Sequence, residues 1–407
     1  MATRSIGKIV FAVATSGITS LLLPSDEAPM SDRCCFECLD RSLRDIFECN
    51  THPFGGMSML LGGDFRQTLP VCPKSTRSQI IALTLPNSHL WPCFQVWKLN
   101  HNMRLSDNNN NNNPTFELST SAFASWLLAV GDGLLGKPNT VNAVDTKWIQ
   151  IPDSLLIPPG ENSLQDLINF VYGDEILSDP SPIDLSVRAI VCPKNNTTNE
   201  INDLILKMTT GNFRIYKSVD TLETNGNQSS ELEAFYPPEY LNELHFSGIP
   251  PHKLLLKVNT PIMLIRNINQ REGLCNGTRL IVSQLLPTVI EAIIITGTSI
   301  GKRIYIPRIK FIHKNTDTPF TLFRKQYLIK PRPITKKIGV YLSQPVFTHG
   351  QLYVALSRAT SPKSIKVLIK NDTNTANNLT KNVVFKDLLH KVEISDVHNS
   401  LATHTNL

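Results

Sequence analysis

An acidic pair follows a short apolar run near the start of the sequence. Asp26-Glu27-Ala28-Pro29 comes shortly after Leu21-Leu22-Leu23. A carboxylate pair just beyond an apolar strand suits phosphoryl transfer, in which one carboxylate binds Mg²⁺ and the other orients and deprotonates the attacking water. The same pair is compatible with a solvated acidic loop, because Asp-Glu pairs are common. Asp26 is therefore a candidate Mg²⁺ ligand, and Glu27 is a candidate catalytic base.

A second polar segment follows the apolar run from Met57 to Leu61. It reads Gly62-Gly63-Asp64-Phe65-Arg66-Gln67, so polar groups come at the end of a predicted strand, where open α/β folds bind ligands. The two glycines permit a tight turn and a close approach of backbone to phosphate. Gly62, Gly63 and Asp64 are candidate cofactor-binding residues, and Gln67 suits the sensing of a γ-phosphate. A glycine turn without further function is the alternative.

Two arginines complete the set of candidate catalytic residues. Arg104 lies in Asn102-Met103-Arg104, and Arg358 ends Tyr353-Val354-Ala355-Leu356-Ser357-Arg358. The apolar residues around the second segment fall on one helical face, which leaves Arg358 to project elsewhere. A fixed guanidinium can stabilise charge on a transferring phosphoryl group, although a single arginine at a helix end is commonly a surface cation.

The elements that must position these residues are those of a layered α/β protein. After an Asn-rich linker, helices are predicted at Phe123 to Val130 and Leu164 to Tyr172, and a second α/β region begins at the strand Ala189 to Cys192. Within it, residues 211–326 are rich in β-branched runs, which indicates an inserted β-barrel or sheet. The remaining predicted elements are strands at Ile9 to Val13, Met57 to Leu61, Val96 to Leu99 and Gly339 to Leu342, a helix at Gly350 to Ala359, and a loosely held tail beyond Asn371.

Composition limits the class of protein. The 407 residues are 41% hydrophobic and 18% charged, which excludes a fibrous or wholly disordered chain. The net charge of +6 permits a nucleic-acid partner without requiring one. Eight irregularly spaced cysteines favour reduced thiols and a cytosolic or nuclear location. The apolar run from Ile9 to Leu23 is too short and too polar to span a membrane, so we expect neither a signal peptide nor a membrane partner.

The four ordered segments together resemble helicase motifs II, III, IV and VI of the Pif-type superfamily-one DNA helicases. The likeness includes the plant copies related to Helitron helicases, and it extends to intervening segments such as Phe36 to Asp45 and Gly273 to Leu280. The likeness covers nearly the whole chain, from Gly7 to about Lys386. It implies two RecA-like parallel-sheet domains, the first truncated, with a small inserted β-barrel-like subdomain.

The resemblance also assigns domains. It implies a truncated first RecA-like domain over 1–105, a linker and helical segment over 106–185, and a second RecA-like domain over 186–210 and 327–370. The inserted β-rich subdomain occupies 211–326, and the tail occupies 371–407.

The resemblance further assigns roles to the candidate residues. Asp26 would bind Mg²⁺, Glu27 would activate water, and Gln67 would sense the γ-phosphate of ATP, while Arg104 and Arg358 would contact it across the interdomain cleft. It implies ATP-driven 5′ to 3′ translocation along single-stranded DNA and unwinding of forked DNA in the nucleus, with roles in DNA repair, recombination and telomere maintenance. DNA binding would use basic grooves and aromatic stacking. Arg266, Lys302 and Arg303 are basic residues of the inserted region.

The sequence departs from this family in three places. First, it contains no Gly-x-x-x-x-Gly-Lys-Ser/Thr segment, the P-loop pattern. Second, only Ala14 to Ser20 separate the motif Ia strand from Leu21. Third, only Lys330 to Lys337 stand where motif V is expected. A phosphate-binding βαβ unit needs about 30 residues, and a parallel crossover about a dozen. Without P-loop amides and lysine, much of the stabilisation of the phosphates is lost. We therefore expect impaired ATP hydrolysis, with a non-catalytic single-strand-binding remnant or an incomplete gene product as the alternative.

A zinc module is a further alternative. Cys35-x-x-Cys38 and Cys49-x-x-His52 have the spacing of zinc ligands. However, Phe36, Leu39 and Leu43 recur at helical intervals between them, and a rigid helix would keep the two pairs apart. The sequence favours an ordinary helix here.

Overall fold

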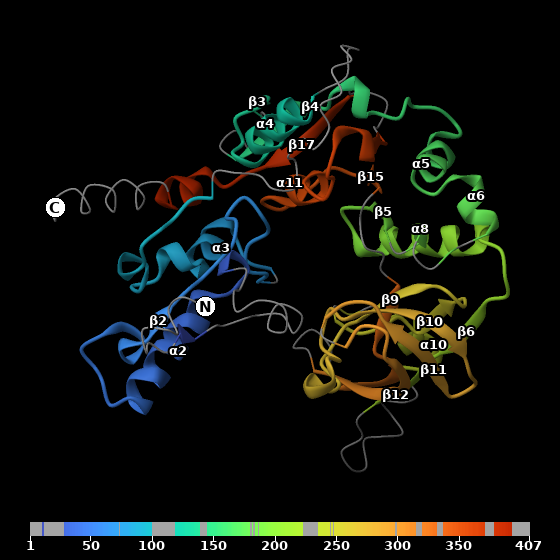
Figure 1. Ribbon diagram of the computed structural model, residues 1–407, viewed down its shortest axis with the longest axis horizontal. Helices are drawn as coiled ribbons and strands as arrows, with labels where there is room; N and C mark the ends of the chain where they lie inside the picture. The colour runs from blue at the N-terminus through green and yellow to red at the C-terminus, as the bar shows by residue number, and fades with distance from the viewer. Residues whose placement is uncertain are drawn as a thin grey trace.

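The computed structural model of the chain contains two α/β parts and one β-subdomain (Figure 1). It describes residues 10–11, 28–72, 74–99, 119–138, 145–179, 181, 184–185, 187–222, 235–244, 246, 248–297, 299–314, 320–331, 337–370 and 378–392. The predicted strand Leu21 to Leu23, the residues Asp26 and Glu27, and the segment Asn102-Met103-Arg104 lie outside these residues. In Figure 1 the β-subdomain lies next to α8, and α2 and α3 lie on the other side of the molecule.

The first part is a small sheet covered by helices. Strand β1 (Val10–Phe11) pairs in parallel with β2 (Ser58–Met59), which places both inside the predicted strands. Helix α2 (Arg33–Ile46) begins where the Asp32 side chain accepts a hydrogen bond from the Cys34 N–H, and it buries Phe36 and Leu43. The other helical elements are η2 (Ala28–Met30), η3 (Pro53–Gly56), α3 (Arg77–Leu83), η4 (Leu85–Asn87) and η5 (Trp91–Cys93).

The predicted strand Val96 to Leu99 is wrong. These residues have no regular structure and pair with no described strand. Trp97 and Leu99 are 79% and 99% exposed. The apolar composition favoured a strand, but β structure depends on pairing and on burial of one face, and this segment has neither.

The second α/β part has a three-stranded parallel sheet in the order β16-β15-β5. The strands are β5 (Arg188–Val191), β15 (Lys337–Leu342) and β16 (Ile365–Ile369), and their apolar runs fit a sheet covered on both faces. Gly339 allows α5 to approach, because a Cβ there would lie 3.0 Å from Val171 Cγ2. The helices are α5 (Ser163–Val171), α6 (Gly173–Ser178), α8 (Asn195–Met208) and α11 (Gln351–Leu356). The predicted helices and strands of this part are confirmed, with α11 shorter than Gly350 to Ala359.

A second sheet overturns the expectation of a loosely held tail. Strand β17 (Leu379–Val383) pairs antiparallel with β4 (Thr146–Gln150), which pairs with β3 (Lys137–Pro138). Helix α4 (Thr120–Gly131) packs in the same core as Val383, Phe385 and Leu388. The prediction failed because it relied on the polar composition of the segment. Strand residues alternate between two environments, and a polar residue can be buried when it is hydrogen-bonded. Asn382 is such a residue, since its amide donates to the Val130 carbonyl at 2.8 Å.

The inserted region is an antiparallel sheet, as expected, but it extends beyond the predicted end at residue 326, because Ile329–Pro331 pair with Pro261–Leu264. Its seven strands run in the order β14-β9-β10-β11-β12-β13-β7, and β6 pairs with β8 beside them. Tyr216 of β6 packs edge-on against Tyr327 of β13, with ring centroids 4.9 Å apart, so the small sheet shares the core of the large one. The strands are β6 (Arg214–Lys217), β7 (Val219–Leu222), β8 (Lys253–Leu256), β9 (Pro261–Leu264), β10 (Arg279–Leu285), β11 (Val289–Ile294), β12 (Arg303–His313), β13 (Leu322–Tyr327) and β14 (Ile329–Pro331), joined by η8 (Gln270–Glu272) and α10 (Pro238–Glu243).

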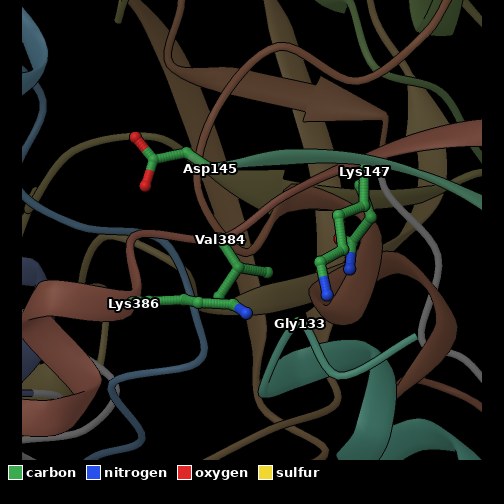
Figure 2. A pocket seen from close by; sticks show the side chains of 6 residues that line it. Gly133, Asp145, Lys147, Val384 and Lys386 are labelled. Carbon is green, nitrogen blue, oxygen red and sulfur yellow. The ribbon is translucent and has the colours of Figure 1, made fainter. Parts of the chain in front are cut away.

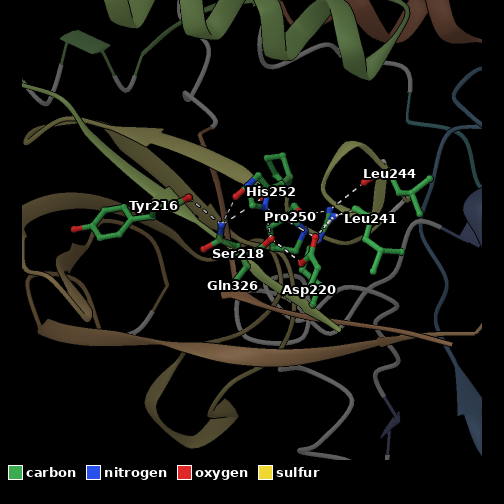
Figure 3. A network of polar contacts seen from close by, with 10 residues as sticks. Tyr216, Ser218, Asp220, Leu241, Leu244, Pro250, His252 and Gln326 are labelled. Atoms are coloured by element: carbon green, nitrogen blue, oxygen red, sulfur yellow. Dashed lines mark hydrogen bonds and ion pairs between the residues drawn. The ribbon is translucent and has the colours of Figure 1, made fainter. Parts of the chain in front are cut away.

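A buried ion pair ties β13 to β7 and to the segment around α10 (Figure 3). The side chains of Arg324 and Asp220 are 1% and 0% exposed, and they meet at 2.7 Å. The remaining guanidinium hydrogens go to the carbonyls of Leu241, Leu244 and Pro250. Arg324 therefore donates hydrogen bonds to one carboxylate and to three backbone carbonyls that lie outside the β-strands.

Candidate functional site

The loop after β2 lies against the residues that follow the acidic pair. The Gly62 carbonyl accepts a hydrogen bond from the Ala28 N–H at 2.8 Å. Gly63 packs so closely on Pro29 that a Cβ at this position would lie 2.2 Å from Pro29 Cδ. The structure thus joins the predicted motif III loop to the end of the motif II segment, and only a residue without a side chain permits this approach.

The Asp64 carboxylate connects this loop to α11. Its Oδ1 accepts from the Arg66 N–H at 3.0 Å, and its Oδ2 accepts from the Tyr353 hydroxyl at 2.9 Å. Burial, followed by the neighbouring Asp64 charge, raises the pKa of Tyr353, so the phenol stays protonated and donates. In this structure Asp64 positions the loop, and its predicted role in cofactor binding stays a prediction.

Arg66 adds an ion pair that the sequence reasoning missed. Its Nε donates to Asp132 Oδ1 at 2.6 Å, just beyond the end of α4, and its Nη1 lies 3.6 Å from Asp64 Oδ1. Burial is the largest single effect and disfavours the Arg66 charge, but the hydrogen bond to Asp132 and the charges of Asp132 and Asp64 together outweigh it and raise the pKa of Arg66. Gly131 makes room for this side chain, since a Cβ there would lie 2.8 Å from Arg66 Cδ.

His349 joins three segments of the chain. It is 3% exposed. Its Nδ1 accepts from the Phe385 N–H at 2.8 Å, which makes Nε2 the protonated nitrogen, and Nε2 donates to the Phe65 carbonyl at 2.8 Å. The neutral imidazole therefore holds the motif III loop against the segment after β17.

Gly350 brings the motif III backbone to the start of α11. It has φ +70°, and a Cβ on it would lie 2.2 Å from the Arg66 carbonyl oxygen and 2.8 Å from the Gln67 carbonyl carbon. Gln67 is half-buried, and Arg358 is exposed just after α11 ends. The structure thus brings Gln67 to the start of α11, the helix that leads to Arg358, whereas Asp26, Glu27 and Arg104 lie outside the described residues.

Stability below neutral pH should report on His349. Burial lowers the pKa of His349, against smaller opposing effects of the Phe65 carbonyl, Asp145 and Asp64. The unfolded chain binds the proton more readily, so this stability is present above about pH 6.5 and is lost as the pH falls below it. We expect the melting temperature to fall more steeply between pH 6.5 and 5 in the native protein than in His349→Gln.

The matched control for that titration is His390→Gln, because His390 is an exposed histidine. It should keep the native slope. His252 and His313 also have lowered pKa values through burial, so some slope should remain in every variant. Equal slopes for the native protein and His349→Gln would contradict the assignment.

No metal centre is found among the described residues, which contain no group of three or more His, Cys, Asp or Glu side chains able to hold an ion. Cys35 and Cys38 lie on α2, as the helical interpretation predicted. The nearest pair, Cys49 Sγ and His52 Nδ1, is 3.8 Å apart in an exposed turn. Since Asp26 is outside the described residues, its predicted Mg²⁺ role is a matter for experiment.

The three basic residues named in the inserted region each have a partner. Lys302 Nζ lies 3.3 Å from Glu272 Oε1, and Arg303 Nη1 lies 3.6 Å from Glu291 Oε1. The Arg266 guanidinium lies 5.0 Å from the centre of the Phe311 ring. These charges are partly balanced within the subdomain, and they do not mark a surplus of positive charge. In the part of the chain that is described, no helix is long and apolar enough to cross a membrane.

Comparison with known proteins agrees with this arrangement. The family model "PIF1-like helicase" matches residues 22–141, and "DNA helicase Pif1, 2B domain" matches residues 239–285. The ATP-dependent DNA helicase PIF1 of Danio rerio is 23% identical over 84% of this chain, which spans 45% of that relative's length. The chain thus spans less than half of this curated relative.

Solved structures share the fold. A Bacteroides Pif1 helicase in complex with ADP-AlF3 and ssDNA is 18% identical with a TM-score of 0.55, over 91% of this chain and 74% of that one. A structure of two coordinating Pif1 helicases at forked dsDNA is 20% identical with the same TM-score, over 91% of this chain and 73% of that one. The expected RecA-like α/β architecture is therefore confirmed. Its first α/β part and its β-subdomain both match models of this family, so the chain is similar to Pif1-type helicases.

Proposed function

We propose that this chain is the motor portion of an ATP-dependent DNA helicase that moves 5′ to 3′ on single-stranded and forked DNA. The observation that supports it best is the direct joining of the motif III loop to motif VI and the residues just before it, through Asp64–Tyr353, Phe65–His349 and Gly350. In a motor of two α/β domains, a nucleotide bound between the domains must change how they contact each other. The hydrogen bonds between Asp64 and Tyr353 and between Phe65 and His349 lie where that change would occur. Nuclear location and roles in DNA repair, recombination and telomere maintenance belong to this proposal.

The chain's own residues divide the work in this proposal. Gln67 sits on a loop whose backbone is packed against Gly350, and Arg358 follows the helix that starts there. Movement of one is thus transmitted to the other through rigid contacts. ATP with Mg²⁺ supplies the phosphoryl group and its charge, which Asp26, Glu27 and Arg104 would hold or act on from the segments not described. Relatives solved with ADP-AlF3 and ssDNA are consistent with these ligands.

We also propose that the polypeptide of these 407 residues hydrolyses ATP poorly, because its sequence has no P-loop. The lysine and amides of that loop provide electrostatic stabilisation of the phosphates that Arg358 alone does not replace. The ATPase rate with saturating single-stranded DNA should equal that of Glu27→Gln within about twofold, whereas loss of a working catalytic base costs about 10²–10⁴-fold. DNA-stimulated hydrolysis that Glu27→Gln abolishes would refute the impairment.

The second candidate function is single-strand binding without hydrolysis by the polypeptide of these 407 residues. The logarithm of the association constant for an oligothymidylate should then fall linearly with the logarithm of salt concentration, with a slope near −0.7 for each phosphate neutralised. Binding that persists without ATP and without unwinding of a forked substrate would select this function. Absence of DNA binding at low salt would remove both candidates.

A further inference from the structure

One face of the β-subdomain is formed by alternate residues of a single extended run. From β6 into β7 the odd-numbered residues Ile215, Lys217, Val219 and Thr221 are exposed. The even-numbered residues between them supply side chains to the core and to the buried network in Figure 3. Because side chains alternate along a strand, the four exposed residues lie on one face. We call these residues and their cross-strand neighbours on the same side the outer face.

Neighbouring strands add three more lysines to the outer face. Lys217 of β6 lies opposite Lys253 of β8. Lys325 of β13 lies opposite both Val219 of β7 and Lys310 of β12. Residues opposite each other in a sheet project from the same side. All four lysines are exposed, and they form a basic band across the outer face.

This basic band has no counter-charge among the described residues. None of its four lysines pairs with a described carboxylate. The Lys310 ammonium lies 3.7 Å from the centre of the Phe323 ring, a contact that leaves its charge in place. The only carboxylate on β6, β7, β8, β12 or β13 is that of Asp220, which is buried with Arg324 on the other side of the sheet. Like charges directly opposite each other destabilise a sheet, and an anionic partner would remove that effect.

Apolar side chains flank the basic band at both ends. Ile215 is 49% exposed and lies opposite Leu255. At the other end Ile312 is 55% exposed and lies opposite Phe323. Successive rows on one face are two residues apart along a strand, which is about 6.5–7 Å. Along β6 and β7 the outer face therefore consists of an apolar row, two rows with lysines and a second apolar row.

We propose that the outer face binds an extended acidic segment of a partner protein. An extended chain presents every second side chain to the surface beneath it, at the same spacing as these rows. Two carboxylates of the segment would lie over the basic band, and an apolar side chain at each end would cover Ile215 or Ile312. Exposed apolar residues beside a charged patch are typical of such interfaces. The proposal does not depend on the helicase function.

A single strand of nucleic acid fits the outer face less well. Such strands bind through bases stacked on aromatic rings as well as through phosphates. The outer face has one aromatic ring, that of Phe323, and the Lys310 ammonium already lies over it. Its other apolar side chains are aliphatic, and they suit contact with aliphatic side chains of a peptide.

The test is fluorescence anisotropy of the full chain with the labelled peptide Ile-Ser-Glu-Ser-Glu-Ser-Ile at physiological salt. When extended, this peptide presents Ile, Glu, Glu and Ile on one side, and the native protein should bind it saturably. The rearranged peptide Glu-Ser-Ile-Ser-Ile-Ser-Glu has the same composition and charge. It should bind at least about threefold more weakly, because its carboxylates would meet the apolar rows.

Removal of the basic band should weaken binding of the first peptide. Lys217→Gln/Lys253→Gln/Lys310→Gln/Lys325→Gln should lose a factor of about 2 to 20, since two exposed ion pairs contribute about that much. This variant should be no less stable than the native protein, because two like-charge pairs are gone. Arginine at the same four positions keeps the charge and should retain binding, which separates loss of the site from loss of the fold.

The matched control changes four exposed lysines outside the β-subdomain, Lys137, Lys194, Lys207 and Lys386. Figure 2 shows the last of these beside Val384, just after β17. Lys137→Gln/Lys194→Gln/Lys207→Gln/Lys386→Gln removes the same charge and should bind the first peptide as the native protein does.

Four results would overturn the proposal. They are equal binding of the two peptides, unchanged binding after removal of the basic band, an equal loss in the control variant, and displacement of the bound peptide by oligothymidylate. The last result would assign the outer face to nucleic acid.

Discussion

Arg324→Met should destabilise the β-subdomain by about 3–5 kcal/mol, because it leaves a buried carboxylate without its partner. The Asp220 side chain is fully buried and meets Arg324 through three contacts of 2.7–3.1 Å. Methionine can fill much of the volume but donates no hydrogen bond, so the Asp220 charge and the carbonyls of Leu241, Leu244 and Pro250 all lose a donor.

Hydrogen exchange is the suitable measurement for this prediction. All four tryptophans, Trp91, Trp97, Trp126 and Trp148, lie outside the β-subdomain, and a chain of several parts does not unfold in one step. Peptides covering β7 and β13 should exchange much faster in Arg324→Met, while peptides of α4 should not change.

Two control variants sharpen the interpretation. Lys325→Met changes the next residue, which is exposed, and should alter stability by less than about 0.5 kcal/mol. Arg324→Met/Asp220→Leu removes both charges and should recover part of the loss, because a buried ion pair can be replaced by apolar side chains more cheaply than it can be broken. If Arg324→Met behaves like Lys325→Met, the buried pair does not hold the subdomain together.

Gly350→Ala should destabilise the contact between motif III and motif VI by about 2–5 kcal/mol. The added methyl group meets the Arg66 carbonyl at 2.2 Å, and backbone cannot move aside as a flexible side chain can. The left-handed conformation costs about 1–2 kcal/mol for a residue with a Cβ, and overpacking adds about 1–3 kcal/mol. Denaturation followed by tryptophan fluorescence should detect it, because Trp126 packs against the core that contains α11.

Gly173→Ala is the matched control for Gly350→Ala. Gly173 has φ +69°, almost the same as Gly350, and a Cβ on it would meet nothing within 4 Å. This variant should lose only the conformational cost of about 1–2 kcal/mol. Equal losses of stability in the two variants would show that the motif III loop is not in close contact with Gly350. A larger loss in Gly350→Ala would locate the contact.

Much of the fold could be predicted from local pattern. Helices α2 and α4 carry apolar residues at helical spacing, and the β-subdomain is built from β-branched runs between turns, so short-range preferences agree with the final structure. Prediction failed where burial depends on distant partners. Val96 to Leu99 has strand composition but no strand to pair with, and residues 379–383 have polar composition but fill an edge beside β4.

The sequence by itself determined the chemical types at the candidate site. Gly62, Gly63, Gln67 and Arg358 stand out because their order and spacing match helicase motifs, whatever the rest of the chain does. The tertiary structure alone decided that Asp64 receives the Tyr353 hydroxyl, 289 positions away, and that His349 donates to Phe65, 284 positions away. Hydrogen bonds and close packing act over a few ångströms, so such contacts exist only once distant segments have been folded together, and local sequence carries no record of them.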